Sequence, residues 1–323
     1  RSKEESLDSI IVDAVRQLRG AFSVLLLTKD ALIAVRDPQS FRPLCLGQKG
    51  DAIIITSESC ALDIIGPDYI RDIEPGELVI VDERGIRSRK AFEPQQQAKC
   101  IFEFIYFSRP DSKVFGVNVD KVRRKLGVVL AENHPVDADI VISVPDSSNT
   151  SSLGFAQSSG IPFEIGLIRN HYVGRTFIQP SQRLRDGTVR LKFNTVDGVL
   201  KGKRVVVVDD SIVRGSTMKK LVVMLRKAGA KEVHLRIASP PVKFPCFYGI
   251  DIPSRSELIA SPTTVDGIRQ YLGVESLEYL TIADLRSVVD DPDHFCNACF
   301  SGEYPIPMAS GLNKSVFEDS AVA

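Results

Sequence analysis

The hydrophobic and polar positions of the first hundred residues change from a helical spacing to short apolar runs. A stripe with a spacing of three to four residues predicts a helix over 5–19 that ends at Gly20. The stripe consists of Ile10, Ile11, Ala14, Val15 and Leu18. Short apolar runs between polar turns then predict strands over 22–27, 32–35, 53–56 and 77–81, and Ile86 follows a charged turn. Ser57 and Glu58 suit the cap and first turn of a short helix to Leu62, so this part is strand-rich with helices at its edges.

Beyond residue 97 strands and helices alternate. Apolar runs predict strands over 102–107, 139–144, 204–208 and 233–238, and an extended stretch over 161–168. Helices are expected over 119–130, 151–159 and 216–228, the last with a buried stripe of Met218, Leu221, Val222 and Leu225 and an end at Gly229. Residues 169–190 form a long, basic, glycine-punctuated stretch that is typical of a loop. The alternation, and the run of β-branched residues at 205–208, predict an α/β domain with a parallel sheet.

Length and charge narrow the classes of protein. The chain has 323 residues with 41 basic and 41 acidic side chains, which is a prior for two domains and leaves no net charge. A neutral chain argues against a nucleic-acid partner held by bulk electrostatics. No apolar run reaches the roughly 18 residues of a membrane-spanning helix, so no membrane partner is expected. The polar stretch at 94–97 suits a boundary, which predicts domains over 1–96 and 97–305 and a flexible tail over 306–323. The chain starts at Arg1 in an acidic stretch, without Met or a signal peptide, as though cut from something longer.

The six cysteines do not form a secreted disulfide pattern, because the chain is large and has no secretory signal. Cys45 and Cys60 lie among apolar neighbours and are expected to be small buried residues. Cys296 and Cys299 form a Cys-x-x-Cys pair that is compatible with half a zinc site, half an iron–sulfur site or a redox pair. Cys100 and Cys246 could complete a site of four thiolates, but spacing alone leaves this open.

Residues 204–217 contain the candidate ligand-binding side chains. A strand of valines ends in Asp209 and Asp210, and a loop with a glycine and hydroxyl side chains then opens a helix. Ligands of open α/β sheets bind at the carboxyl ends of strands, and a helix N-terminus after such a loop suits a phosphate. The two acids would repel that phosphate but suit sugar hydroxyls or a magnesium ion. Together these features predict a site for a phosphorylated ribose bound with magnesium.

This stretch resembles the 5-phosphoribosyl 1-pyrophosphate (PRPP) loop of type I phosphoribosyltransferases. Further segments, in the same order, resemble the glutamine PRPP amidotransferase family, and the resemblance covers nearly the whole chain. These segments are Val144–Ser147, Gly166–Phe177, Pro180–Gln182, Val208–Gly215 and Ala238–Pro241. The first 95 residues, through Arg36-Asp37-Pro38, Arg42-Pro43-Leu44 and Ser57–Leu62, look like the later part of the family's glutaminase domain. The implied fold is a type I phosphoribosyltransferase parallel-sheet domain preceded by the C-terminal part of an αββα N-terminal-nucleophile glutaminase domain.

The resemblance implies a role for each matching residue. The implied activity is that of an amidophosphoribosyltransferase, a pentosyltransferase that opens purine biosynthesis by forming 5-phosphoribosylamine and pyrophosphate from PRPP and glutamine-derived ammonia. Asp209 and Asp210 would meet the ribose hydroxyls and Mg²⁺, and Ser147 would face the metal and the pyrophosphate. The loop residues expected to hold the phosphate, with the other PRPP contacts, are Ser211, Arg214, Gly215, Ser216, Thr217, Arg175 and Lys192. The 169–190 loop would close over the substrate and exclude water.

The family also implies cofactors and partners. One of its branches carries a [4Fe–4S] cluster whose ligands match Cys100, Cys246, Cys296 and Cys299, with structural zinc as the alternative. Homotetramers, feedback inhibition by purine nucleotides and a cytoplasmic location are expected on the same ground. The family's N-terminal cysteine nucleophile has no match here, so no glutaminase residue is carried over and ammonia-dependent activity is the most that is expected.

The sequence departs from the family pattern at a few positions. Ser148, Asn149 and Thr150 replace a glycine and small apolar residues after Ser147, which puts the pyrophosphate loop in doubt because glycine allows conformations that serine resists. Ser40 also stands where glycine is common. Two other functions stay open: a salvage-type purine phosphoribosyltransferase, and a non-catalytic regulator that binds PRPP or a nucleotide.

Overall fold

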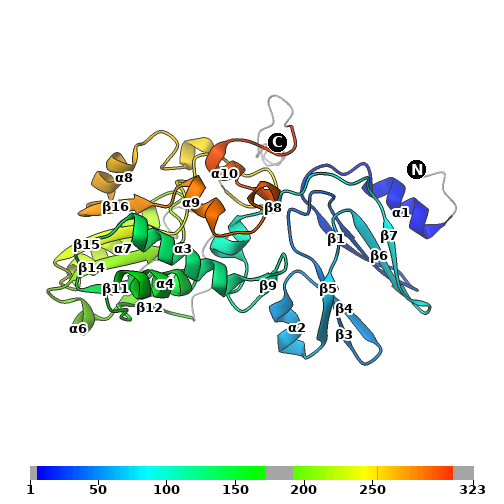
Figure 1. The fold of residues 1–323 in the computed structure, drawn as a ribbon, viewed down its shortest axis with the longest axis horizontal. Coiled ribbons are helices and arrows are strands. Elements are labelled where there is room, and N and C mark those ends of the chain that lie inside the picture. The colour runs from blue at the N-terminus through cyan, green and yellow to red at the C-terminus, as the bar shows by residue number, and fades with distance from the viewer. Residues whose placement is uncertain (1–5, 172–191, 253, 308–323) are drawn as a thin grey trace, which may run out of the picture.

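The computed structural model describes residues 6–171, 192–252 and 254–307. Two parts lie side by side: a strand-rich first part on the right of Figure 1 and an α/β part on the left. In the described residues no helix is both long and apolar enough to cross a membrane.

The first part holds two antiparallel sheets and two helices. One sheet has the order β1 (Ser23–Leu27), β2 (Leu32–Arg36), β6 (Glu77–Asp82) and β7 (Gly85–Lys90). The other has the order β4 (Ala52–Thr56), β3 (Cys45–Lys49) and β5 (Asp68–Asp72), and α2 (Ser59–Ile65) packs beside it. Helix α1 (Leu7–Val15) covers the first sheet through Ile11, Val12 and Val15, whereas Ile10 and Leu18 of the expected stripe are exposed. Strands β3 and β5 were not expected from the sequence.

The expected cap of α2 is wrong. Glu58, not Ser57, is the N-cap residue, and it makes no side-chain cap hydrogen bond. The Glu58 carboxylate instead accepts hydrogen bonds from the Arg109 amide and the Ser112 hydroxyl, both at 2.8 Å. The side chain therefore joins the two parts of the molecule, which local sequence could not reveal.

The second part is built on a sheet of order β11 (Ile140–Ser143), β14 (Arg204–Asp209), β15 (Glu232–Ile237) and β16 (Ser276–Tyr279), and each pairing is parallel. One face packs α3 (Val119–Asn133) and α4 (Asn149–Ser159), and the other packs α7 (Ser216–Lys227) and α8 (Val265–Leu272) (Figure 1). Val205 and Val207 point to the α7 side while Val206 and Val208 point to the α3 side. The valine run is buried on both faces, as its composition predicts.

Smaller elements complete this part. They are β8 (Lys99–Cys100), β9 (Lys113–Val114), β10 (Val117–Asn118), β12 (Leu167–Arg169), β13 (Phe193–Thr195), α6 (Asp197–Leu200), the short η3 (Arg255–Glu257), α9 (Ile282–Ser287), η4 (Pro292–His294), β17 (Phe295–Cys296) and α10 (Ala298–Ser301). The predicted stripe of α7 is confirmed, since Met218, Leu221, Val222 and Leu225 are its buried residues.

The expected strand over 102–107 is wrong, because this segment is the π-helical turn η1 (Glu103–Phe107). Its carbonyl groups bond to a side chain instead of to a neighbouring strand: the Arg123 guanidinium donates to the Phe104 carbonyl at 2.8 Å and to the Ser108 carbonyl at 2.8 Å. An alternation of apolar residues cannot distinguish this arrangement from a strand, since the deciding partner lies in α3.

The two parts meet along a short main-chain pairing and a charged contact. Ala98 and Cys100 donate their amides to the Gln39 and Phe41 carbonyls at 2.7 and 2.9 Å. The Arg42 guanidinium forms an ion pair with the buried Glu103 carboxylate at 3.0 Å. The division at 96–97 lies beside this pairing and stays a prediction, as does the tail, most of which lies outside the described residues.

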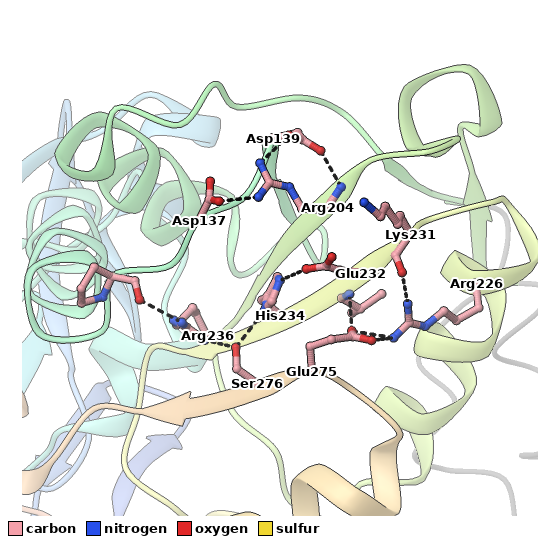
Figure 2. Close-up of polar contacts among 12 residues, drawn as sticks. Asp137, Asp139, Arg204, Arg226, Lys231, Glu232, His234, Arg236, Glu275 and Ser276 are labelled. Atoms are coloured by element: carbon pink, nitrogen blue, oxygen red, sulfur yellow. Dashed lines mark hydrogen bonds and ion pairs between the residues drawn. The ribbon is translucent and has the colours of Figure 1, made fainter.

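The ends of the sheet opposite the carboxyl ends carry an ion-pair network (Figure 2). Arg204, the first residue of β14, contacts Asp139 at 2.9 Å, and Arg226 of α7 contacts Glu275 at 2.6 Å. These pairs are partly exposed, so each contributes at most about 1 kcal/mol to stability. They anchor the sheet at the edge away from the acidic motif.

Candidate functional site

The site lies at the carboxyl ends of β11 and β14, two adjacent parallel strands. Strand β14 ends at Asp209, and α7 begins at Ser216 after the loop 210–215. Gly215 is the N-cap residue with φ of +75°, a conformation that favours glycine. A side chain there would also meet the Ile259 side chain at 2.6 Å. Gly215 therefore lets the loop close tightly onto the first turn of α7, where the first amides have no partner within the helix.

Both carboxylates are held by hydroxyl groups from the two loops. The Ser147 and Ser211 hydroxyls donate to Asp210 at 2.5 and 2.7 Å. The Ser148 hydroxyl lies 3.2 Å from the Asp209 carboxylate. Ser147 and Ser148 follow β11, so the structure brings the Pro-Asp-Ser loop and the acidic motif together.

The acids are in an environment that disfavours their charge. Burial raises the pKa of both Asp209 and Asp210, and the charge of Asp210 raises the pKa of Asp209 further. Asp209 is half-buried, and Asp210 is buried and only 6% exposed. Two adjacent carboxylates in such surroundings favour a cation, and this donor set fits Mg²⁺, which takes one or two carboxylates together with oxygens of the substrate.

The other residues expected to contact PRPP differ in their surroundings. The charge of Lys192 acts to lower the pKa of Asp209, against the larger effect of burial, which raises it. Arg214 forms an ion pair with Glu257 at 2.9 Å on an exposed surface, beside a shallow pocket of about 270 Å³ that Tyr271 also lines. Ser216 and Thr217 are exposed at the start of α7. Arg175 and most of the 169–190 loop lie outside the described residues.

The serine that replaces the family's glycine fits its position. Ser148 has φ of −93° and ψ of 1°, and a negative φ does not require the conformational freedom of glycine. Its one hydroxyl hydrogen is shared between the Val144 carbonyl, which is the shorter contact, and the Asp209 carboxylate. The backbone at Ser148 therefore does not need a glycine, and the effect of residues 148–150 on activity stays a prediction. Ser40 differs, because its φ of +62° lies in the region that favours glycine.

Two residues near the site were missed by sequence reasoning. Tyr279 ends β16, and its buried hydroxyl has no hydrogen-bond partner among the described residues, while the charge of Asp209 contributes to raising its pKa. Arg123 lies inside α3 and contacts the Ser147 carbonyl at 3.5 Å. Tyr279 was missed because strand β16, which it ends, was not predicted from the sequence. Arg123 was missed because a lone arginine in a helical pattern is ordinarily taken for a surface residue.

The four candidate metal-binding cysteines converge from separate segments. Cys100 and Cys296 are register partners on the parallel strands β8 and β17, and Cys299 follows in α10. Burial raises the pKa of Cys100, Cys296 and Cys299, and the charge of Cys246 raises each of them further. All six cysteines are free thiols, and Cys45 and Cys60 are buried as expected. In the described residues, however, no three His, Cys, Asp or Glu side chains are grouped closely enough to hold a metal ion.

Known proteins match this arrangement. The phosphoribosyl transferase domain family matches residues 157–238. Amidophosphoribosyltransferase 2, chloroplastic, of Arabidopsis thaliana is 52% identical over 92% of this chain and 53% of its own length. The amidophosphoribosyltransferase of Bacillus subtilis is 47% identical over 94% of this chain and 65% of its own length. The chain thus spans about half to two thirds of the length of these relatives.

Two solved structures are also similar to this chain over most of its length. The glutamine PRPP amidotransferase of B. subtilis, complexed with ADP and GMP, superimposes with a TM-score of 0.89 at 46% identity, covering 96% of this chain and 70% of that one. A structure described as the allosteric regulatory enzyme of purine biosynthesis has the same TM-score of 0.89 and identity of 46%, over 68% of its own chain. With its acidic motif at the carboxyl ends of a parallel sheet, this chain belongs to the amidophosphoribosyltransferase family.

Proposed function

We propose that the α/β part of this chain transfers ammonia onto the ribose of PRPP. The nitrogen forms a bond with C1 while the bond between C1 and the pyrophosphate oxygen breaks. The electron pair leaves with pyrophosphate, and ammonia loses a proton to solvent. The product is 5-phosphoribosylamine, and the physiological ammonia would come from glutamine.

The observation that carries this proposal is the pair Asp209 and Asp210 between two hydroxyl-bearing loops. In this proposal their carboxylates meet the two ribose hydroxyls and Mg²⁺, and Ser147 lies beside them. The α7 N-terminus, with Ser216 and Thr217, would bind the 5-phosphate, because a helix N-terminus favours an anion. Magnesium, when bound, neutralises charge on the leaving pyrophosphate. The protein residues bind and orient the substrate, which is the larger share of the work in a reaction of this kind.

The test is pyrophosphate release from PRPP with ammonium chloride and magnesium. Asp209→Asn should lower the rate by about a hundredfold or more, since it removes one of two charges placed for the metal and the sugar. Asp139→Asn is the matched control, because Asp139 lies at the opposite edge of the sheet beside Arg204 (Figure 2) and should leave the rate unchanged. Near-normal turnover by Asp209→Asn would contradict the assignment.

The same assay separates the two other candidate functions. Turnover that needs a purine base in place of ammonium would indicate a salvage-type phosphoribosyltransferase. Binding of PRPP without turnover would indicate a regulator. Relatives at about half identity that are named amidophosphoribosyltransferases favour the first function over both.

We further propose that Cys100, Cys246, Cys296 and Cys299 hold a [4Fe–4S] cluster. Four free thiols from three segments that influence one another electrostatically support this donor set. A cluster binds each thiolate to a different iron, so its ligands stand farther apart than the four ligands of one zinc ion. Structural zinc stays the alternative, and the iron, sulfide and zinc content of the protein distinguishes the two. The role of the cluster would be to tie the C-terminal segment to the junction at β8.

The nucleotide-bound B. subtilis neighbour supports purine nucleotides as inhibitors of this chain. The homotetramer and the cytoplasmic location stay predictions, and several plant relatives are named as chloroplastic.

A further inference from the structure

Arg123 is a fully buried arginine whose hydrogen bonds, among the described residues, all go to main-chain carbonyl oxygens. It lies in α3 and is 2% exposed. Three of its contacts are on the segment of η1: the Phe104 carbonyl at 2.8 Å, the Ser108 carbonyl at 2.8 Å and the Glu103 carbonyl at 3.4 Å. The fourth is the Ser147 carbonyl at 3.5 Å. A buried guanidinium is costly unless its donors are bonded, so these carbonyls and the arginine depend on one another.

The fourth contact leads into the proposed phosphoribosyl site. The Ser147 hydroxyl bonds to Asp210 at 2.5 Å, so the Arg123 side chain holds the main chain of the residue that holds the acid. Burial lowers the pKa of Arg123, and the charge of Asp210 acts against this effect. Arg123 can therefore influence the position of Asp210 through Ser147 without contacting the carboxylate directly.

The other contacts lead to the junction between the two parts of the molecule. The Glu103 carboxylate lies between Arg42, at 3.0 Å, and the Ser108 hydroxyl, at 2.5 Å. The Arg42 guanidinium also lies over the Phe107 ring, 4.8 Å from its centroid. The turn η1 is therefore fixed from the first part by Arg42 and from α3 by Arg123.

We propose that Arg123 is a positioning residue for PRPP: it holds the Ser147 main chain against η1, so that the Ser147 hydroxyl and the Asp210 carboxylate keep the arrangement that takes magnesium-bound substrate. This inference rests on the proposed function. Only a planar guanidinium has the fork of donors that serves both η1 and Ser147, and a lysine in its place keeps the charge but not the fork.

The experiment measures the Kd of PRPP by calorimetry in the presence of MgCl₂, together with pyrophosphate release and thermal melting. Arg123→Lys should weaken binding roughly tenfold, because errors of about an ångström in positioning are costly at such sites. Arg236→Lys is the matched control. Arg236, drawn in Figure 2, is 3% exposed and donates to the His134 and Leu235 carbonyls at 2.9 Å, and in the described residues none of its hydrogen bonds goes to Ser147 or to the two acids. It should lower the melting temperature and leave the Kd unchanged. Arg123→Gln replaces the lysine variant if melting shows that the latter is unfolded.

A double variant decides whether Arg123 acts through Ser147. Ser147→Ala alone should also weaken binding, and the pair Arg123→Lys with Ser147→Ala should bind about as weakly as the weaker single variant. The inference would be overturned if the loss of PRPP affinity in the double variant equals the product of the two single losses. It would also be overturned if Arg123→Lys binds PRPP with the Kd of the unaltered chain. If the unaltered chain binds PRPP but releases no pyrophosphate, the proposed function fails while the Kd comparison still decides the role of Arg123. An unaltered chain that does not bind PRPP would overturn both.

Discussion

Replacement of Gly127 by alanine tests the contact that positions the Pro-Asp-Ser loop. Gly127 lies in the middle of α3 where it packs against α4, and a Cβ there would lie 1.9 Å from the Ser151 carbonyl oxygen and 2.8 Å from the Phe155 nitrogen. Gly154 of α4 faces α3 in the same way, with a Cβ position 2.2 Å from the Arg124 carbonyl oxygen. The two helices therefore touch through their backbones.

The expected loss of stability follows from the 1.9 Å distance between the new Cβ and the Ser151 oxygen. Ordinary contact begins near 3.4 Å, so the new carbon and the Ser151 oxygen must separate by about 1.5 Å, and both belong to stiff helices. Overpacking of this kind costs about 3 kcal/mol, at the upper end of the usual range. For a domain of this size the melting temperature should fall by about 10 °C. Because α4 begins at Asn149, directly after Ser147 and Ser148, the shift should also weaken PRPP binding.

The assay is thermal unfolding followed by circular dichroism, with PRPP binding measured on the folded variant. Gly198→Ala in α6 is the matched control, since a Cβ there has no atom within 4 Å. In a helix alanine is favoured over glycine by up to about 1 kcal/mol, so the control should melt at the same or a slightly higher temperature. A Gly127→Ala variant that melts within about 1 °C of the unaltered chain would refute the close helix contact.

Two further predictions concern an acid and a thiol. Burial raises the pKa of Asp37 to about 6; the folded state then binds more protons than the unfolded state between about pH 4 and 6, and stability from this group is lost as pH rises through that window. Asp37→Asn does not lose stability in this way. The melting temperature of the variant minus that of the unaltered chain should therefore rise from pH 4 to 6 and stay level above pH 6. A difference that does not change with pH would contradict the raised pKa of Asp37. The protein purified without oxygen should be brown and contain iron and sulfide, and Cys246→Ser should lose most of both while Cys45→Ser keeps them; colourless protein loaded with zinc would exclude the cluster.

Much of the fold could be predicted because burial follows local pattern. The stripe of α7 and the valines of β14 each bury residues at the spacing of their own element, so the sequence suffices to find them. The acidic motif could likewise be recognised, because parallel strands bring their carboxyl ends to one edge of a sheet. The family resemblance extended this to most of the chain.

The sequence by itself therefore determined the elements with regular periodicity, the parallel α/β class and the acidic core of the site. Only the tertiary structure decided that 103–107 is a π-helical turn, that Glu58 bonds across the junction and that Arg123 reaches Ser147. The physical reason is the same in each case. A buried polar group must find its partner wherever the fold places one, and these partners lie 15 to 54 residues away along the chain. Local spacing predicts which residues leave water, but not which distant groups satisfy them.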